Sequence, residues 1–147
     1  MKRLTPVLMV SDLPASLAFW HEQLGFELKG TVPVDPQGPP DGPLGFAMLQ
    51  YGAVEMMLQS LDSVRLDVPD LIGDDVPAMD GIGLFVEVDG PLDPWLSKIE
   101  GCEVLVPRRQ TFYGADEIGV RTPDGATLML ASFGEGEAAG GDSPQEE

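Results

Sequence analysis

The amino-acid sequence contains one pattern twice, and this internal repeat limits the possible folds more than any other feature. Residues 24–28 (LGFEL) resemble residues 100–104 (EGCEV), and residues 52–53 (GA) recur as 125–126. The copies lie roughly 70 to 80 residues apart, and similarity at a fixed spacing indicates a repeated structural unit. The chain is therefore expected to consist of two similar halves.

The first half predicts a strand, a helix and three further strands. An apolar run over residues 4–10 predicts a buried strand, and Asp12 is the expected N-cap of a helix. Apolar residues at helical spacing place that helix before Gly25: Leu13, Leu17, Trp20 and Leu24. The following strands are expected over residues 26–28, 44–51 and 53–59, with a loop rich in Pro, Gly and Asp at 33–43.

The second half predicts the same order of elements. A strand over residues 82–88 precedes a short helix, for which Asp93 is the expected N-cap and Pro94 the first helical residue. Leu92, Leu96 and Ile99 form the apolar stripe of this helix. The remaining segments are strands at 102–106, 118–121 and 126–131, a loop at 107–113 and a turn at 122–125.

The predicted fold class is therefore α+β, with two βαβββ modules that form a curved mixed sheet around a cleft. The chain has 147 residues, enough for one domain. We expect this domain to span residues 1–133, with module one at 4–60, a connection with one short turn of helix at 61–80, and module two at 81–133. Residues 134–147 are expected to form a disordered acidic tail.

Charge and hydropathy exclude several classes of partner. The formal net charge is −17, from 25 acidic and 8 basic residues. Such a surplus repels nucleic acid and attracts cationic ligands. Apolar runs fall far short of the roughly 20 residues that span a bilayer, and the first residues lack a signal cleavage site. We therefore expect a cytoplasmic protein with neither a nucleic-acid nor a membrane partner.

The opening and the close of the chain carry recognisable motifs. The opening reads TPVLMVSDL over residues 5–13, SLAFW over 16–20 and LGF over 24–26, and the close reads YG at 113–114 and VRTPDG over 120–125. Together they resemble the vicinal-oxygen-chelate superfamily of glyoxalases, bleomycin-resistance proteins and extradiol dioxygenases. Thr122 departs from the pattern, since aspartate is usual there. The resemblance covers residues 4–133 and specifies a fold better than an activity.

Within this superfamily, the chain looks most like the bleomycin-resistance proteins. The likeness rests on Phe19-Trp20 in the first helix, on the acidic balance and on the length. It implies a non-catalytic homodimer that sequesters a cationic, metal-chelating glycopeptide in clefts between subunits. Antibiotic resistance by sequestration is the function that this resemblance favours.

The metal enzymes of the superfamily carry one His, Glu or Gln on each of four strands. Spacing to the motifs places these positions on Thr5, Glu55, Gly83 and Met129. Threonine, glycine and methionine are not usual ligands of a divalent ion, and one carboxylate cannot complete a catalytic site. We therefore expect neither a metal nor another cofactor.

The strand around Glu55 has two possible registers, and the preferred one packs Met56 and Leu58 against a helix. Extended to the other strands, this alternation predicts the side chains that face the cleft. The predicted ligand-binding residues are Met9, Glu55, Met57, Phe85, Glu87 and Met129 on strands, with Phe112 and Tyr113 at the mouth. Methionines adapt to irregular ligands, and aromatic faces attract cations. Alternatively, these side chains fill a collapsed cleft and bind nothing.

Other chemically interesting residues favour structural roles. His21 lies one position off the apolar stripe and is expected to face solvent or a neighbouring subunit. The acidic pairs Asp74-Asp75 and Asp116-Glu117 fall in loop-like segments, where solvated pairs are expected. Cys102 is expected to be a small buried hydrophobe. We therefore expect no nucleophilic or histidine-based catalysis.

The leading hypothesis is a metal-free binding protein for a small or medium-sized hydrophobic ligand, cationic ligands included. The alternative is a metal-dependent lyase, isomerase or oxygenase of the glyoxalase or dioxygenase type, in which the metal positions lie elsewhere than assigned. A third hypothesis is a protein that uses only its dimer surface. The expected partners are a small molecule and a second copy of the chain.

Overall fold

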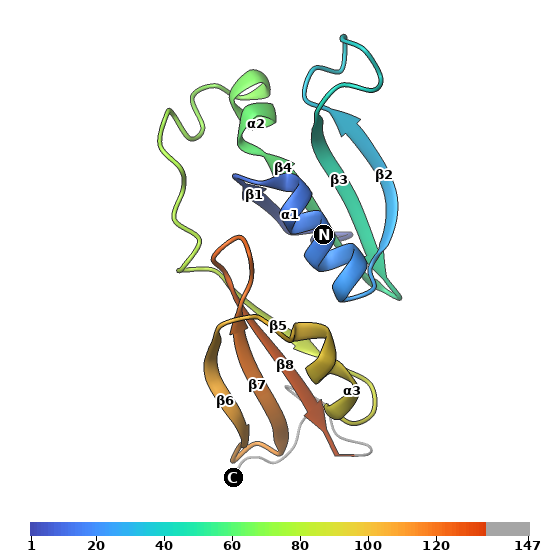
Figure 1. Ribbon diagram of the computed structural model, residues 1–147, viewed down its shortest axis with the longest axis vertical. Helices are drawn as coiled ribbons and strands as arrows, with labels where there is room; N and C mark the ends of the chain where they lie inside the picture. The colour runs from blue at the N-terminus through green and yellow to red at the C-terminus, as the bar shows by residue number, and fades with distance from the viewer. Residues whose placement is uncertain (135–147) are drawn as a thin grey trace. The chain divides into compact units, whose positions relative to one another are not determined.

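A computed structural model of the chain describes residues 1–134, so the acidic tail expected at 134–147 lies outside the described residues from position 135 onward. The chain divides into two compact units, Met1–Ala78 and a second that begins at Met79. Figure 1 shows that each unit contains one sheet and short helices.

The first unit has the order strand, helix and three strands, followed by one more helix. Its elements are β1 (Val7–Val10), α1 (Leu13–Leu17), the π-helix η1 (Ala18–Gln23), β2 (Glu27–Pro33), β3 (Leu44–Tyr51), β4 (Val54–Ser60) and α2 (Leu61–Asp67). The sheet has the strand order β1-β4-β3-β2. β1 runs parallel to β4, while the other neighbours are antiparallel.

The second unit repeats this topology. Its elements are β5 (Gly83–Glu87), α3 (Asp93–Leu96), the 3₁₀-helix η2 (Ser97–Ile99), β6 (Val104–Gln110), β7 (Ala115–Arg121) and β8 (Thr127–Phe133). The strand order is β5-β8-β7-β6, with β5 parallel to β8. The α+β class and the two βαβββ modules are therefore confirmed, as two four-stranded mixed sheets.

One face of each sheet carries the core of its unit. In the first unit, Leu8, Val10, Leu49 and Leu58 are each at most 3% exposed. Helix α1 contacts β3 and β4 of this sheet, and Figure 1 shows it lying across them. In the second unit the core includes Leu92, Ile99, Val120, Leu128 and Leu130. These faces match the apolar alternation that the sequence predicts.

The stripe of leucines predicted a regular first helix, but the helix is irregular. Asp12 is the N-cap as predicted, because its side chain accepts a hydrogen bond from Ala15 N at 3.0 Å. From Ala18 onward the helix widens to a π-helix, in which Leu24 N donates to Phe19 O at 2.9 Å. A π turn holds an extra residue and so rotates the inward face. Phe19 and Trp20 are therefore both buried, whereas Leu17 is only half-buried.

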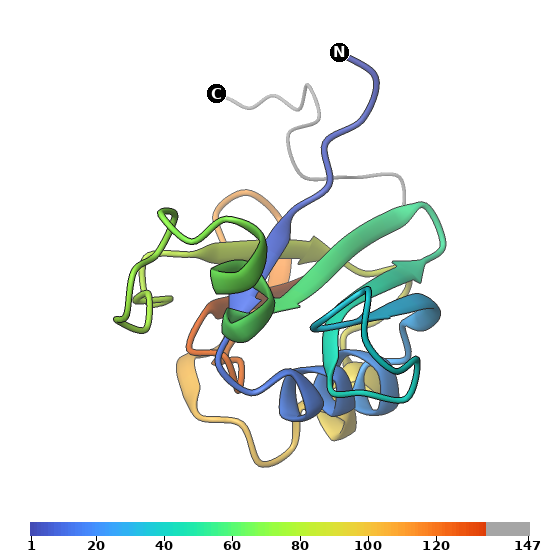
Figure 2. The same ribbon diagram turned by 90° about the horizontal axis from the view of Figure 1, so that it is seen from above.

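Two helices differ from expectation. The connection contains the seven-residue helix α2, longer than the single turn predicted; Ser60 caps it by accepting a bond from Ser63 N. This helix contacts β1, β3 and β4, and it is drawn in green in Figure 2. In α3 the N-cap is Leu92 rather than Asp93, and no side chain caps it. Asp93 instead pairs with Arg108.

The predicted loop at 107–113 is wrong for its first half. β6 continues to Gln110, and β7 begins at Ala115 rather than at 118. Pro107 suggested a loop because proline cannot donate to a strand ladder. However, β6 is an edge strand, and its register shifts between Val106 and Arg109, the interval that contains this proline. Edge strands and bulges are the places where a sheet accepts proline.

No helix within residues 1–134 is long and apolar enough to cross a membrane.

Candidate functional site

In the first unit, the sheet face opposite the core is only partly covered. Along β4, Met56 and Leu58 are 4% and 0% exposed, while Glu55 and Met57 are half-buried. Since neighbouring side chains on a strand point to opposite faces, Glu55 and Met57 lie on the face away from the core. This is the preferred one of the two registers. We call this face, with Val7, Met9, Met48, Glu55 and Met57, the first open face.

Methionines form much of the first open face. Met57 is the register partner of Val7 on β1 and of Met48 on β3. A Cβ atom added to Gly30 would lie 3.0 Å from Met48 Cε, so Met48 extends over that glycine. Flexible thioether side chains in this arrangement form an apolar surface that can adapt its shape.

Glu55 is paired within its own unit. Arg3 Nη1 donates to Glu55 Oε1 at 3.2 Å, and the two side chains are 69% and 32% exposed. An ion pair this open to solvent contributes about 0 to 1 kcal/mol. Arg3 therefore offsets the Glu55 charge only loosely.

The corresponding face of the second unit carries Phe85, Glu87, Arg109, Glu117 and Met129, and we call it the second open face. Phe85 and Met129 are register partners, and Phe85 is 48% exposed. A Cβ atom on Gly119 would lie only 2.5 Å from Met129 Sδ, so Met129 lies across the strand at that glycine. Glu87 follows Phe85 on the same face and is exposed.

The eight predicted ligand residues thus divide between the units. Met9, Glu55 and Met57 lie on the first open face. Phe85, Glu87 and Met129 lie on the second open face, while Phe112 and Tyr113 lie in the hairpin loop between β6 and β7 of the same unit.

A buried carboxylate on the second open face was missed by the sequence interpretation. Glu117 is fully buried, and its register partners are Arg109 on β6 and Ala131 on β8. Arg109 donates from Nε to Glu117 Oε2 at 2.8 Å and pairs through Nη2 at 2.7 Å. The Tyr113 hydroxyl donates to the other oxygen, Oε1. The idea of a solvated Asp116-Glu117 pair in a loop is therefore wrong.

These contacts shift the titration of both partners. The hydrogen bond to Glu117 raises the pKa of Tyr113, and partial burial of the phenol and the nearby Glu117 charge act in the same direction. The Glu117 hydrogen bond also raises the pKa of Arg109. Arg109 therefore stays charged and Tyr113 stays a hydrogen-bond donor throughout the physiological pH range.

The β6–β7 hairpin holds two aromatic rings at its end. Thr111 N donates to Ala115 O at 2.8 Å, and Ala115 N donates back to Thr111 Oγ1 at 2.9 Å. Phe112 is fully exposed, and its ring lies edge-on to Tyr113 with 5.1 Å between centroids. Tyr113 also lies 6.2 Å from the ring of Phe133. An ordered loop thus presents aromatic faces beside the buried carboxylate.

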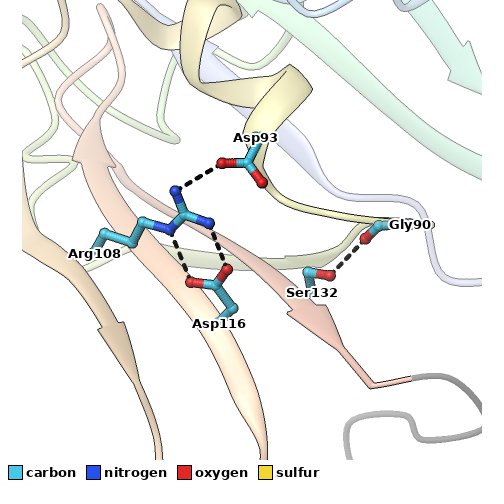
Figure 3. A network of polar contacts seen from close by, with 5 residues as sticks. All are labelled: Gly90, Asp93, Arg108, Asp116 and Ser132. Atoms are coloured by element: carbon cyan, nitrogen blue, oxygen red, sulfur yellow. Dashed lines mark hydrogen bonds and ion pairs between the residues drawn. The ribbon is translucent and has the colours of Figure 1, made fainter.

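The neighbouring arginine, Arg108, lies on the opposite face of the same hairpin. Figure 3 shows Arg108 between two carboxylates: it donates from Nε and Nη2 to Asp116, at 3.0 and 2.7 Å, and from Nη1 to Asp93 at 2.9 Å. The Arg108 hydrogen bond lowers the pKa of Asp93. Ser132 donates to Gly90 O near this cluster. Arg108 therefore links α3 to β7.

One pattern in the sequence could have revealed both pairs. Arg109 and Glu117 lie directly opposite each other across the β6–β7 loop, whereas Arg108 and Asp116 pair diagonally, because Asp116 lies opposite Gln110. Opposite charges on the two sides of a turn indicate cross-strand pairs in a hairpin. The loop predicted at 107–113 hid this pattern.

His21 has a hydrogen-bond partner within its own unit. It is partly buried, and its Nδ1 lies 2.6 Å from Phe26 O. Because a carbonyl oxygen only accepts, Nδ1 is the donor, and this bond ties the end of η1 to the residue that precedes β2. The side chain therefore has a structural partner within its own unit.

The four positions that the resemblance assigns to metal ligands do not fit a divalent ion. Thr5 and Gly83 precede or begin their strands, Met129 lies over Gly119, and Glu55 pairs with Arg3. A thioether and a glycine supply no hard donor, so the set provides one carboxylate. Elsewhere within residues 1–134, no three His, Cys, Asp or Glu side chains lie so that they could hold a metal ion.

A protein-family model matches most of the chain. The model of the Glyoxalase/Bleomycin resistance protein/Dioxygenase superfamily matches residues 3–130. No curated protein matches the chain.

Solved structures share the fold at low sequence identity. A glyoxalase/bleomycin resistance protein/dioxygenase from Nocardioides is 20% identical, with a TM-score of 0.64 over 95% of this chain and 89% of that one. A glyoxalase-related enzyme from Fulvimarina pelagi is 20% identical, with a TM-score of 0.65 over 90% and 88%. A protein of unknown function from Agrobacterium tumefaciens is 16% identical, with a TM-score of 0.68 over 90% and 94%. At sequence identities this low, the similarity shows a shared fold and nothing about function.

Proposed function

Because the chain belongs to the glyoxalase/bleomycin resistance protein/dioxygenase superfamily, we propose that it sequesters a small or medium-sized hydrophobic ligand, cationic ligands included, without a resident metal. The observation that carries this proposal is a methionine beside an exposed aromatic ring, at the position that the resemblance assigns to the fourth metal ligand. Met129 and Phe85 are register partners on the second open face. A thioether and a ring bind apolar groups and cations rather than divalent ions.

Several observations support the cationic part of the proposal. Glu87 on the second open face and Glu55 on the first add carboxylates to apolar surroundings. The net charge of −17 attracts cations at long range. More specifically, the proposal is that the chain forms a cytoplasmic homodimer and confers drug resistance by this sequestration.

The test is calorimetric titration with metal-free and copper-loaded bleomycin, a cationic glycopeptide with planar rings, at two salt concentrations. Association should weaken as salt rises, because long-range attraction is screened over about 10 Å at 0.1 M ionic strength. Glu55→Gln and Glu87→Gln should each reduce the salt dependence. If the affinity changes neither with salt nor with the two glutamine substitutions, the ligand is bound by hydrophobic contacts and the electrostatic contribution is rejected.

Phe85→Ala tests the aromatic contribution. Binding should weaken by about two- to tenfold, because aromatic contacts contribute about 0.5 to 1.5 kcal/mol. Leu71→Ala is the matched control, since Leu71 is similarly exposed at 53% but lies in the segment between α2 and β5. Absence of bleomycin binding at millimolar concentration would reject drug sequestration.

The metal-dependent alternative is decided by elemental analysis of the purified protein. Stoichiometric zinc, nickel, iron or manganese would reject the proposed metal-free function. Sub-stoichiometric amounts that dialysis against a chelator removes without changing bleomycin binding would support it.

A further inference from the structure

The second open face holds a carboxyl side chain that is fully buried. Glu117 has no exposed surface, yet it lies on the face turned away from the hydrophobic core. Burying a carboxylate is costly unless cations and hydrogen-bond donors compensate for lost water. Here Arg109 serves one oxygen and Tyr113 the other.

Both groups that bond to this carboxylate are themselves exposed to solvent. The Arg109 side chain is 55% exposed, and Tyr113 is 42% exposed. A long arginine side chain with this exposure can rotate away without disturbing the packed core. The cation that pairs with Glu117 is therefore carried by a side chain that can move.

The surroundings suit a cation that carries a flat apolar group. Tyr113 contacts the rings of Phe112 and Phe133, at 5.1 and 6.2 Å between centroids. Aromatic faces within about 6 Å of a cation attract it. The neighbouring arginine, Arg108, pairs with Asp116 and connects β6 to α3 through Asp93.

From this geometry we propose that Glu117 is a recognition site for a planar N–H cation, a guanidinium or amidinium attached to an apolar body, and that Arg109 occupies it as an intramolecular competitor. The ligand's N–H groups replace those of Arg109 at Oε2, while Tyr113 continues to hold Oε1. This inference rests on the same face as the proposed sequestration and names the charged group of its ligand.

The geometry of the donors explains why the cation is planar. Arg109 places two neighbouring nitrogens against a single carboxylate oxygen, with Nε as the hydrogen-bond donor at 2.8 Å and Nη2 in an ion pair at 2.7 Å. A guanidinium or amidinium reproduces this fork, whereas a primary ammonium presents a compact charge with different geometry. The site therefore prefers amidinium over alkylammonium ligands.

The test uses benzamidine, a phenyl ring that carries an amidinium, with the full-length chain. The wild type should bind it weakly, Arg109→Ala at least tenfold more tightly, and Glu117→Gln not measurably. Butylammonium should bind Arg109→Ala several-fold more weakly than benzamidine does. Benzamidine affinity that is equal in the wild type and Arg109→Ala would overturn the proposal.

Arg108→Ala is the matched control, because it removes a neighbouring arginine from the opposite face of the hairpin. Its benzamidine affinity should equal that of the wild type, and an increase like that of Arg109→Ala would overturn the proposal by showing an effect of lost positive charge alone. The double variant Arg109→Ala/Glu117→Gln should not bind, since it lacks the carboxylate.

Folding of the variants provides a second readout. Arg109→Ala leaves a buried carboxylate without its cation, so its melting temperature should fall and benzamidine should restore it in a saturable way. If Arg109→Ala does not fold, Arg109→Lys keeps a cation for Glu117 but loses the planar fork, and it should still bind benzamidine more tightly than the wild type. Equal binding by Arg109→Lys and wild type would then reject the competitor role.

The outcomes separate this inference from the proposed function. Bleomycin binding by the wild type, with no gain of benzamidine affinity in Arg109→Ala, keeps sequestration and rejects the Glu117 site. A tenfold gain for benzamidine without bleomycin binding keeps the Glu117 site and rejects drug sequestration.

Discussion

At the scale of single residues, the hydrogen bond between Tyr113 and Glu117 makes the fold less stable as the pH becomes alkaline. This bond raises the pKa of Tyr113 in the folded chain above its usual value near 10. A raised pKa contributes stability that is fully present below the unfolded pKa and lost as pH rises through the folded one.

The first prediction follows from this linkage. Phenolate absorbance of Tyr51→Phe, which retains Tyr113 as its one tyrosine, should appear at higher pH than in the unfolded chain. Adding Glu117→Gln should bring the titration back toward its usual range. Unfolding in urea between about pH 9 and 12 should show a steeper loss of stability for Tyr51→Phe than for Tyr113→Phe. Identical pH profiles would contradict the bond.

The second prediction concerns the leucines of the first helix. Leu24 is 2% exposed, whereas Leu17 is half-buried beside the π-helix. Leu24→Ala should destabilise the fold by about 2 to 5 kcal/mol, and Leu17→Ala by clearly less. Denaturant unfolding measures both. Equal costs would show that the π turn does not redirect the buried face, as would a smaller cost at Leu24.

The side chains of the candidate site were predictable only where strand alternation decides the face. Glu55 and Met57 lie on the predicted face because their neighbours Met56 and Leu58 are buried on the opposite face. Glu117 was missed because the strand was expected to begin at Ile118, whereas β7 begins at Ala115. Its partner Arg109 lies beyond a proline that suggested a loop.

At the scale of the elements, the repeated βαβββ order was predictable because each strand and helix is bounded by a turn residue. Gly25 and Gly101 occupy corresponding places after the two helices, with φ of 92° and 93°. This left-handed conformation strongly favours glycine, so the repeat in the sequence reports a repeat in the backbone. The π-helix and the length of α2 were not predictable, because both depend on packing against the sheet.

The third prediction compares two strand glycines. A Cβ atom on Gly45 in β3 would lie 2.7 Å from Val34 Cα and 2.9 Å from Val34 N, whereas one on Gly83 in β5 meets nothing within 4 Å. Gly45→Ala should cost about 1 to 3 kcal/mol, because backbone cannot yield as a side chain can. Gly83→Ala should be neutral or slightly stabilising. Melting temperatures of the two variants check this, and similar values would contradict the close approach at Gly45.

At the scale of the whole molecule, the fourth prediction is a homodimer. It rests on the two similar modules and on apolar side chains left exposed on described surfaces, such as Val54 and Phe85 at 53% and 48%. Sedimentation equilibrium at micromolar concentration should give twice the chain mass of 15.7 kDa. The mass of a single chain would exclude a ligand site shared between two copies.

The contact of Met129 with Gly119 also constrains the order in which this chain can change over evolutionary time. Because the sulfur atom lies where a Cβ atom at 119 would be, a larger residue at 119 is compatible only with a shortened or redirected side chain at 129. A lineage that acquires a carboxylate at 129 would therefore most easily change position 129 before position 119. Descendants that enlarged position 119 early would have lost the methionine, and with it the present ligand surface.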